Sequence, residues 1–209
     1  MATALEKARR DPGSMKSRIL QSARRLFGEY GFHGVTTRMI AKDVGIDIST
    51  LHYHWGDKQT LYEAVVTDLN DEVRAKFIEI ERRVRGKGLA FRLEVAIDVM
   101  CDHLFAHPEA SQLMLQSYFS KTRNDEVTDT AMSEHITNIA LAMGLGPDRT
   151  EVSPEDIARV LALWNSAINF TSGEALFRPL LDVERERYIA IVKDTLKFIL
   201  IPAFTGEKT

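Results

Sequence analysis

Apolar residues recur every three or four positions along most of this chain of 209 residues, which is the spacing of one face of an α-helix. A helix of about 26 residues, such as the one we expect between residues 58 and 83, would span about 40 Å. The sequence shows no useful run of alternating apolar and polar residues, so we predict an all-α fold. The apolar positions of that long helix are Leu61, Val65, Leu69, Val73, Phe77 and Ile80.

Capping residues and glycines divide this pattern into separate helices. Ser14, Thr36 and Asp47 are suited to begin three short helices, and a glycine is placed to end each of them. Farther on, we expect an interruption near Pro179 and the end of the last helix near Pro202. The expected helices span about residues 14–30, 36–44, 48–55, 58–83, 89–106, 108–120, 125–143, 154–177 and 183–200.

The segment from residue 36 to residue 55 has the pattern of a helix-turn-helix, in which a glycine-led turn joins two short helices. Ile40, Val44 and Leu51 are spaced to pack these helices against each other. An isolated helix of about eight residues is marginal in water, so packing on this inward face must hold the second helix. Its outward side chains suit hydrogen bonds to phosphates and base edges in the major groove of DNA. These outward residues are Ser49, Thr50, His52, Tyr53 and His54.

The charge distribution agrees with a nucleic-acid partner at one end of the chain. Residues 1–58 contain ten basic and six acidic residues, which gives this segment a net charge of +4. The rest of the chain contains 17 basic and 24 acidic residues and has a net charge of −7. A basic amino-terminal quarter on an acidic body favours contact with a polyanion through that quarter alone.

Other features of the sequence favour a cytoplasmic protein. Cys101 is the only cysteine, so no disulfide can form within the chain. The sequence has no apolar run of about 18 residues, so we expect no membrane span. The first residues lack the apolar core of a secretion signal, and we expect residues 1–13 to form a flexible polar arm.

The segment "GFHGVTTRMIAKDVGIDISTLHYHWGDKQTLYEAV" resembles the DNA-binding head of the tetracycline-repressor (TetR) family of bacterial regulators, and the resemblance covers about residues 19–66. The family pattern has Gly-Phe after the first helix, Thr-Thr and Ile-Ala in the second, a Gly-Val turn, a "TLY-H-F" recognition helix and a following lysine. Three residues depart from it. His52 stands where the family usually has tyrosine, Trp55 replaces the usual phenylalanine, and Ser49 stands where glycine is common.

The resemblance implies roles for individual residues of this head. Thr37 would contact a phosphate, Arg38 would reach a base or a phosphate, and Lys58 would clamp a phosphate at the start of the fourth helix. Side chains of the recognition helix would lie in the groove. The expected DNA-binding residues are Thr36, Thr37, Arg38, Ser49, Thr50, His52, Tyr53, His54 and Lys58.

The resemblance also implies the organisation and function of the whole chain. We expect a helix-turn-helix DNA-binding domain at residues 14–57 and a helical ligand-binding and dimerisation domain at residues 58–209. The implied function is a transcriptional repressor that binds a palindromic operator as a homodimer and is released by a small, largely apolar effector. The expected partners are double-stranded DNA, a second copy of the chain and that effector, without a cofactor, a membrane or an enzymatic activity.

Two apolar stripes on the last long helices allow two interpretations. A stripe of this kind packs in the core of its own chain or, as the resemblance favours, in a four-helix bundle with a second subunit. The first stripe consists of Ile157, Val160, Leu161, Trp164 and Ile168. The second consists of Tyr188, Ile191, Val192, Thr195, Leu196 and Ile199.

A set of adaptable apolar residues with a few polar ones marks a candidate ligand pocket, although the same residues also suit an ordinary core. Asn165 and Asn169 lie one turn apart and, if buried, need a ligand, another subunit or water as hydrogen-bond partners. The candidate ligand-binding residues are Met100, His103, Leu104, Met114, Leu115, Tyr118, Phe119, Trp164, Asn165, Ile168 and Asn169.

Other functions have less support in the sequence. His103 and His107 share a helix face, but nothing completes a metal site, and His107 is better interpreted as a helix-end residue. The sequence contains no glycine-rich phosphate loop and no nucleophile elbow, which argues against an enzyme. A DNA-binding dimer without a ligand is a further alternative, and the size of the acidic body argues against it.

Overall fold

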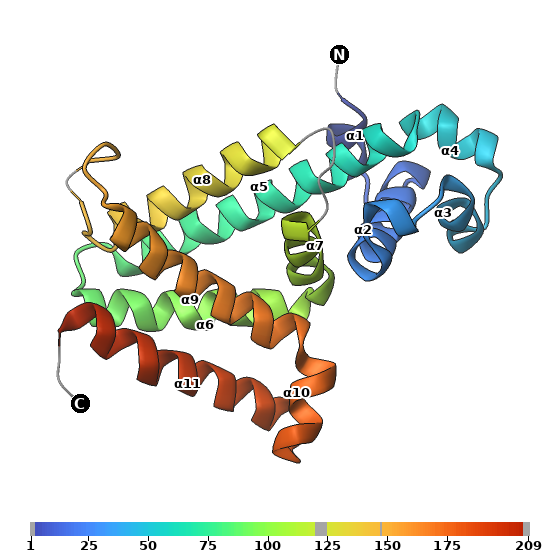
Figure 1. Ribbon diagram of the computed structural model, residues 1–209. Helices are drawn as coiled ribbons and strands as arrows, with labels where there is room; N and C mark the ends of the chain where they lie inside the picture. The colour runs from blue at the N-terminus through green and yellow to red at the C-terminus, as the bar shows by residue number, and fades with distance from the viewer. Residues whose placement is uncertain (1–2, 120–124, 147, 207–209) are drawn as a thin grey trace. The chain divides into compact units, whose positions relative to one another are not determined.

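The computed structural model describes residues 3–119, 125–146 and 148–206, without the side chains of residues 117–119 and 125–132. This described part contains eleven α-helices and no strand (Figure 1). The predicted all-α fold is confirmed, with two helices more than the nine expected. It contains no helix that combines the length and the apolar character needed to cross a membrane.

The chain forms two compact units, which we call the head unit and the body unit. The head unit comprises residues 1–72 and 112–125, and the body unit comprises residues 73–111 and 126–209. Helices α5 (Lys58–Val84) and α7 (Pro108–Phe119) each contribute residues to both units. The sequence-based domain boundary between residues 57 and 58 stays a prediction.

The head unit contains the three expected helices as α2 (Met15–Gly34), α3 (Thr37–Val44) and α4 (Ile48–Trp55), followed by the start of α5. The side chains of Ser14 and Thr36 accept hydrogen bonds from backbone amides three residues farther on, as caps do. Asp47 occupies the same position before α4 without a side-chain cap bond. The backbone of α2 leaves the helical conformation at the expected stop, Gly31, whose φ is 68°, and the element continues beyond this kink to Gly34.

An additional helix, α1 (Ala4–Arg10), lies within the segment that we expected to be a polar arm. Its first turn is closed by a reciprocal pair of hydrogen bonds between Thr3 and Glu6, and Ala8 is buried. Arg9 pairs with Asp68 of α5 at 2.7 Å. The sequence-based interpretation missed this helix because one buried alanine produces almost no apolar pattern.

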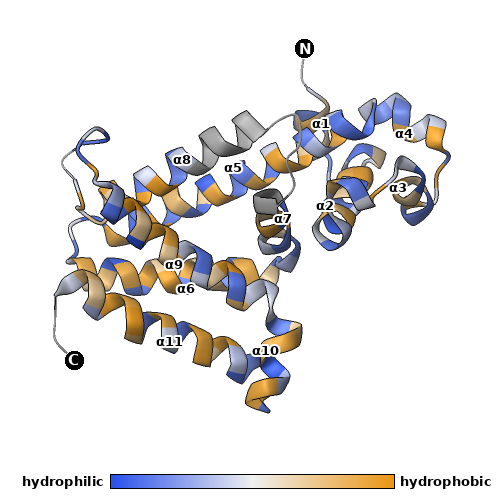
Figure 2. Ribbon diagram, in the orientation of Figure 1, coloured by the Kyte–Doolittle hydropathy of each residue, from blue (hydrophilic) through white to orange (hydrophobic). Residues whose placement is uncertain are grey.

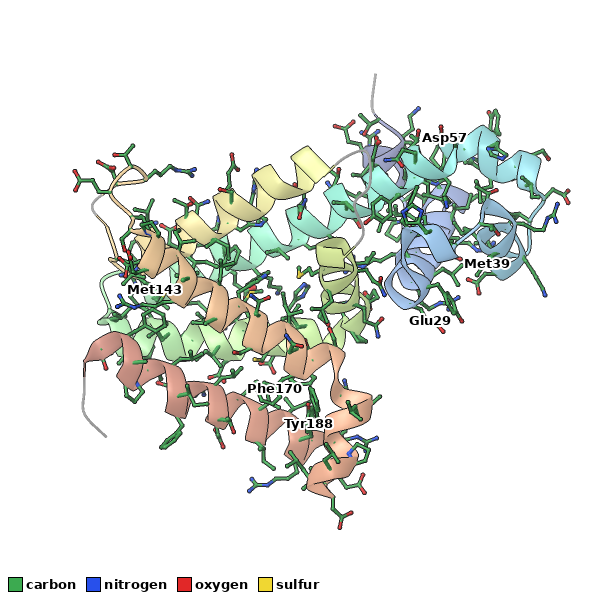
Figure 3. The ribbon with its side chains drawn as sticks, in the orientation of Figure 1. Glu29, Met39, Asp57, Met143, Phe170 and Tyr188 are labelled. Atoms are coloured by element: carbon green, nitrogen blue, oxygen red, sulfur yellow. The ribbon has the colours of Figure 1, made fainter. Side chains whose placement is uncertain are left out.

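The body unit is built around α6 (Leu89–Ala106), α9 (Pro154–Ser172) and α11 (Arg185–Thr205), each of which packs against the other two (Figure 1). Helix α8 (Asp125–Ala142) and the second part of α5 complete this unit. Tyr188 of α11 is buried and donates its hydroxyl hydrogen to the carbonyl oxygen of Phe170 at 2.8 Å, and the two residues lie together in Figure 3. This bond ties α11 to α9.

Most of the two apolar stripes belong to the core of the body unit, which was the first of the two interpretations. A stripe that faces neighbouring helices of its own chain is shielded from water by those helices and needs no second subunit for its burial. The buried members are Val160, Trp164, Ile168, Tyr188, Val192 and Leu196.

The carboxy-terminal helices differ from the expectation in two places. The long helix breaks at Gly173 instead of Pro179, and a separate helix, α10 (Glu174–Leu181), follows. A side-chain carbon on residue 173 would lie 2.9 Å from the carbonyl oxygen of Asn169, so this close turn requires glycine. Pro179 and Pro202 lie within α10 and α11, each in the last turn of its helix.

Candidate nucleic-acid interface and body cavity

Helix α4 is held to the head unit by its inward face. Leu51 and Trp55 lie one turn apart and are buried. The indole N–H of Trp55 donates to the carbonyl oxygen of Lys16 at 3.1 Å, and the ammonium group of Lys16 donates to the carbonyl oxygen of His54 at 2.6 Å. Two hydrogen bonds therefore fix the carboxyl-terminal end of α4 to Lys16 of α2.

The outward face of α4 carries Ser49, His52 and Tyr53, as predicted from the spacing. Tyr53 is 84% exposed, which is unusual for a large aromatic residue, and its ring lies 5.1 Å from that of His54. Thr50 and His54 are half-buried. Burial, with a smaller effect of the Lys16 charge, lowers the pKa of His54 and favours its neutral form.

His52, the residue that departs from the TetR pattern, has a local structural contact. Its Nδ1 atom lies 2.6 Å from the carbonyl oxygen of Gly56. Because a carbonyl oxygen only accepts, Nδ1 must carry the hydrogen and Nε2 of the neutral ring is left as an acceptor. In this tautomer His52 closes the end of α4 but has no hydrogen to offer to a phosphate oxygen.

The amino terminus of α3 offers backbone donors to an anion. The hydroxyl of Thr36 accepts from the amide of Met39 at 3.2 Å. The amides of Thr37 and Arg38, at the first helical positions, have no partner within the helix. The side chain of Arg38 is exposed and that of Thr37 is half-buried. This arrangement suits a phosphate group.

Lys58, at the start of α5, is half-buried and bound within the head. Its ammonium group donates to the carbonyl oxygens of Phe32 at 2.9 Å and Val35 at 3.0 Å, and it lies 4.2 Å from the centre of the Phe32 ring. An ammonium group has three hydrogens, so one is left for a phosphate. Lys58 thus closes the end of α2 and keeps one donor for a ligand.

The body unit contains a partly open cavity of about 580 Å³. It is lined by residues of α5, α6, α8, α9 and α11, and its walls are mainly aliphatic and aromatic. Cys101 is one of the lining residues, and burial raises the pKa of its thiol to about 12, so the thiol stays protonated at neutral pH.

Few polar groups reach this cavity. The Nε1 atom of Trp164 is buried and has no hydrogen-bond partner among the described residues. His135 is also buried at the wall, and its burial, together with the charge of Arg74, lowers its pKa and favours the neutral ring. Arg74 itself lies 3.7 Å from the carboxylate of Glu134.

Comparisons with known proteins connect the head to one family. A model of bacterial regulatory proteins of the tetR family matches residues 19–65. The regulator UidR of Escherichia coli K12 is 28% identical over 147 residues, which are 67% of this chain and 70% of UidR. The repressor AcnR of Corynebacterium diphtheriae is 34% identical over 94 residues, 45% of this chain and 42% of AcnR. The head of the chain is therefore that of a TetR-family regulator.

The fold of the whole chain agrees with this family. A TetR-like transcriptional regulator from Rhodococcus sp. RHA1 superposes with a TM-score of 0.66 at 14% sequence identity, covering 92% of this chain and 96% of that structure. The predicted resemblance to the TetR family is confirmed, and the protein is a DNA-binding transcription regulator rather than an enzyme.

The predicted ligand-binding residues of this TetR protein are only partly brought together. Met100, Leu104 and Trp164 line the cavity. His103 and Ile168 are buried but do not line the cavity. Asn165 is half-buried and Asn169 is exposed. Met114 and Leu115 belong to the head unit. The side chains of Tyr118 and Phe119 lie outside the described part.

The sequence-based set missed much of the cavity wall. Helices α5, α8 and α11 contribute Phe77, His135 and Leu196, which the apolar pattern alone could not distinguish from ordinary core residues. The rings of His103 and His107 are 5.0 Å apart. Among the described residues, no three histidine, cysteine or acidic side chains gather as a metal site requires.

Proposed function

We propose that this TetR protein is a dimeric repressor that binds a palindromic operator and is released by a small, largely apolar effector. The observation that carries the proposal is the exposed hydrogen-bonding face of α4, anchored from behind by Leu51 and Trp55. An anchored helix of this kind fits the major groove with Tyr53 directed at the bases. The relative AcnR carries the name of a repressor, which favours repression over activation here.

A second copy of the chain is supported by exposed apolar residues on the last two helices (Figure 2). The side chains of Leu180 and Phe198 are 75% and 71% exposed, and Leu176, Leu181 and Ile199 are also exposed. Large exposed apolar side chains on two successive helices favour a protein–protein interface. A two-fold dimer would present two α4 helices to half-sites about 34–36 Å apart.

The effector site is proposed in the body cavity. Its volume of about 580 Å³ lies within the range of small-molecule sites, roughly 300–1,000 Å³, and its walls suit an apolar ligand. Helix α5 contributes Phe77 and Val84 to this wall and Lys58 to the head. A ligand that moves α5 would therefore change the presentation of the DNA-binding residues.

Such coupling requires that the ligand bind the two conformations of the protein with different affinities. Coupling free energies of about 1–3 kcal/mol are typical, which correspond to roughly 5- to 150-fold changes in operator affinity. A ligand-blind DNA-binding dimer is the second candidate, and for it no cavity ligand would change the operator affinity.

The test is a gel-shift titration with an inverted-repeat operator and a random duplex. Tyr53→Ala is expected to reduce the preference for the operator, because it removes a base contact. Lys58→Ala is expected to weaken binding to both duplexes and to reduce the salt slope by about one, because it removes one phosphate contact. Wild-type behaviour of both variants, or a monomer without any operator preference, would contradict the proposal.

A further inference from the structure

One residue of the cavity wall, Trp164, carries a buried donor without an acceptor among the described residues. Trp164 is only 3% exposed, and its Nε1 atom has no hydrogen-bond partner among the described residues. An indole nitrogen is a donor only, so it cannot be satisfied by another donor. Buried polar groups in native proteins are almost always paired, which makes this atom an exception that needs an explanation.

The other tryptophan of the chain makes the contrast clear. The sequence contains two tryptophans, and the indole N–H of Trp55 in the head unit donates to the carbonyl oxygen of Lys16 at 3.1 Å. Trp164 has no comparable carbonyl partner in the described part, and it lines the cavity. Trp164 therefore combines an unsatisfied N–H group with a place in the wall of a space large enough for a ligand.

The surroundings of Trp164 are aromatic and uncharged. The ring of Phe77 lies 6.0 Å from that of Trp164, and the ring of His135 lies 5.7 Å from that of Phe77. His135 is held in its neutral form by burial and by Arg74. A neutral ligand is thus favoured at this end of the cavity, because nothing beside Trp164 provides a counter-charge.

The charged residues of the cavity wall do not alter this conclusion. Arg74 faces Glu134 at 3.7 Å, and Glu81 faces Arg85 at 3.6 Å, so each has an opposite charge nearby. Arg92 is half-buried and partly in contact with water, which can solvate its charge. None of the three charged wall residues, Arg74, Glu81 and Arg92, therefore needs an opposite charge on the ligand.

We infer that the effector is an apolar, uncharged molecule with a carbonyl-type oxygen that accepts the Nε1 hydrogen of Trp164. This inference rests on the proposed function and specifies the chemistry of the ligand at the same site. The apolar walls select for the hydrocarbon part of the ligand, and Trp164 selects for the oxygen and fixes its position. An otherwise identical hydrocarbon would leave the indole N–H unpaired in the cavity.

The test uses butyrophenone and butylbenzene, which have the same carbon skeleton and differ by a carbonyl in place of a methylene. Both probes are titrated into the full-length protein with ¹⁵N-labelled tryptophan and ¹³C-methyl-labelled methionine. The methyl groups of Met100 and Met143 line the cavity and report whether a probe occupies it. The indole signal of Trp164 reports the hydrogen bond, and the signal of Trp55 is the reference within the same molecule.

Both probes are expected to shift the Met100 and Met143 signals, but only butyrophenone is expected to move the Trp164 proton downfield. The ketone should bind roughly five- to tenfold more tightly than the hydrocarbon, the equivalent of one net hydrogen bond. In Trp164→Phe, which keeps an aromatic ring and lacks the N–H, this ratio should fall to about one. Met114→Leu, outside the cavity lining, is the control and should keep the wild-type ratio.

Two outcomes would overturn the inference, and they are distinguishable. If both probes occupy the cavity with equal affinity and an unmoved Trp164 signal, the cavity binds apolar molecules but Trp164 does not select a carbonyl. If neither probe shifts the methionine signals, the ligand-binding part of the proposed function fails as well. The operator gel shift, carried out without a probe, tests the DNA-binding part separately. Should Trp164→Phe not fold, the comparison of the two probes in the wild type still decides.

Discussion

At the scale of single residues, basic side chains close the carboxyl ends of the three helices of the head. Lys16 donates to the His54 carbonyl at the end of α4, Arg18 to the Val44 carbonyl at the end of α3, and Lys58 to two carbonyls at the end of α2. A cation at a helix carboxyl terminus is favoured by the helix dipole. Much of the positive charge of the head is therefore committed to its own fold.

The sequence predicted which residues of α4 face outward, but it did not reveal these contacts. The outward set follows from helical spacing around Leu51 and Trp55, both of which are local. The partners of Lys16 and Arg18 lie 38 and 26 positions away along the chain, and nothing in the local pattern identifies them. The net charge of the first 58 residues thus overstates the charge that is free to meet DNA.

His52 permits a test at this scale. We expect His52→Tyr to raise the affinity for DNA roughly fivefold, because a tyrosine hydroxyl can donate to a phosphate whereas the Nδ1 hydrogen of His52 is bonded to the carbonyl oxygen of Gly56. The free energy of unfolding should fall by about 0.5–1 kcal/mol through loss of the Gly56 contact. The salt slope should be unchanged, since tyrosine adds no charge.

The matched control is His52→Phe, which loses the Gly56 contact and adds no hydroxyl. It should show the same loss of stability by denaturant unfolding and no gain in affinity by gel shift. Equal gains for the tyrosine and phenylalanine variants would show that the phosphate hydrogen bond is not the cause.

At the scale of elements, the sequence predicted where helices begin better than where they end. Thr36 and Ser14 act as caps because their hydroxyl groups bond to nearby amides, a relation that is local in sequence. The break between α9 and α10 depends instead on the approach of Phe177 to Gly173 in three dimensions. For this reason Pro179, the stronger local signal, gave the wrong position for the break.

Gly173→Ala should therefore be costly. An added methyl group would lie 2.3 Å from the Phe177 ring and 2.9 Å from the Asn169 carbonyl oxygen, and one of these groups must move. We expect the free energy of unfolding to fall by about 2 kcal/mol, within the range for overpacking. Urea unfolding measures it, with Gly88→Ala as the control because no atom lies within 4 Å of the added carbon there. Equal effects of the two substitutions would refute the explanation.

At the scale of the whole molecule, the sequence indicated a helical body with a ligand site but placed only part of the cavity. Met100, Leu104 and Trp164 were among the candidates, whereas His135 was not, because a single histidine on an apolar helix has no distinguishing spacing. Whether an apolar residue lines a cavity or fills a core depends on the packing of five helices. A one-dimensional pattern does not contain that information.

The buried His135 predicts a dependence of stability on pH. Its pKa in the folded protein is lowered from 6.5, chiefly by burial and also by Arg74, with Glu134 opposing the shift. Below pH 6.5 the unfolded chain therefore binds more protons than the folded chain, and stability decreases as the pH falls. Above pH 6.5 the effect vanishes, because the histidine is neutral in both states.

We expect denaturant unfolding at pH 7.5 and 5.5 to show a smaller loss of stability for His135→Gln than for the wild type. His54, whose pKa is also lowered, contributes in the same direction, so some pH dependence should remain. Parallel pH curves for the wild type and the variant would mean that His135 does not carry the effect.

The assembly of two chains is the property of the whole molecule on which operator recognition depends. Leu180 and Phe198 are exposed on α10 and α11, so replacing both with glutamate should leave the folded chain intact and place charges in the proposed interface. We expect sedimentation to show a monomer and the preference for an inverted repeat over a half-site to disappear. Phe91→Glu, an exposed residue of α6, is the control and should remain dimeric. A dimer that persists with both glutamates would place the interface on another face of the body.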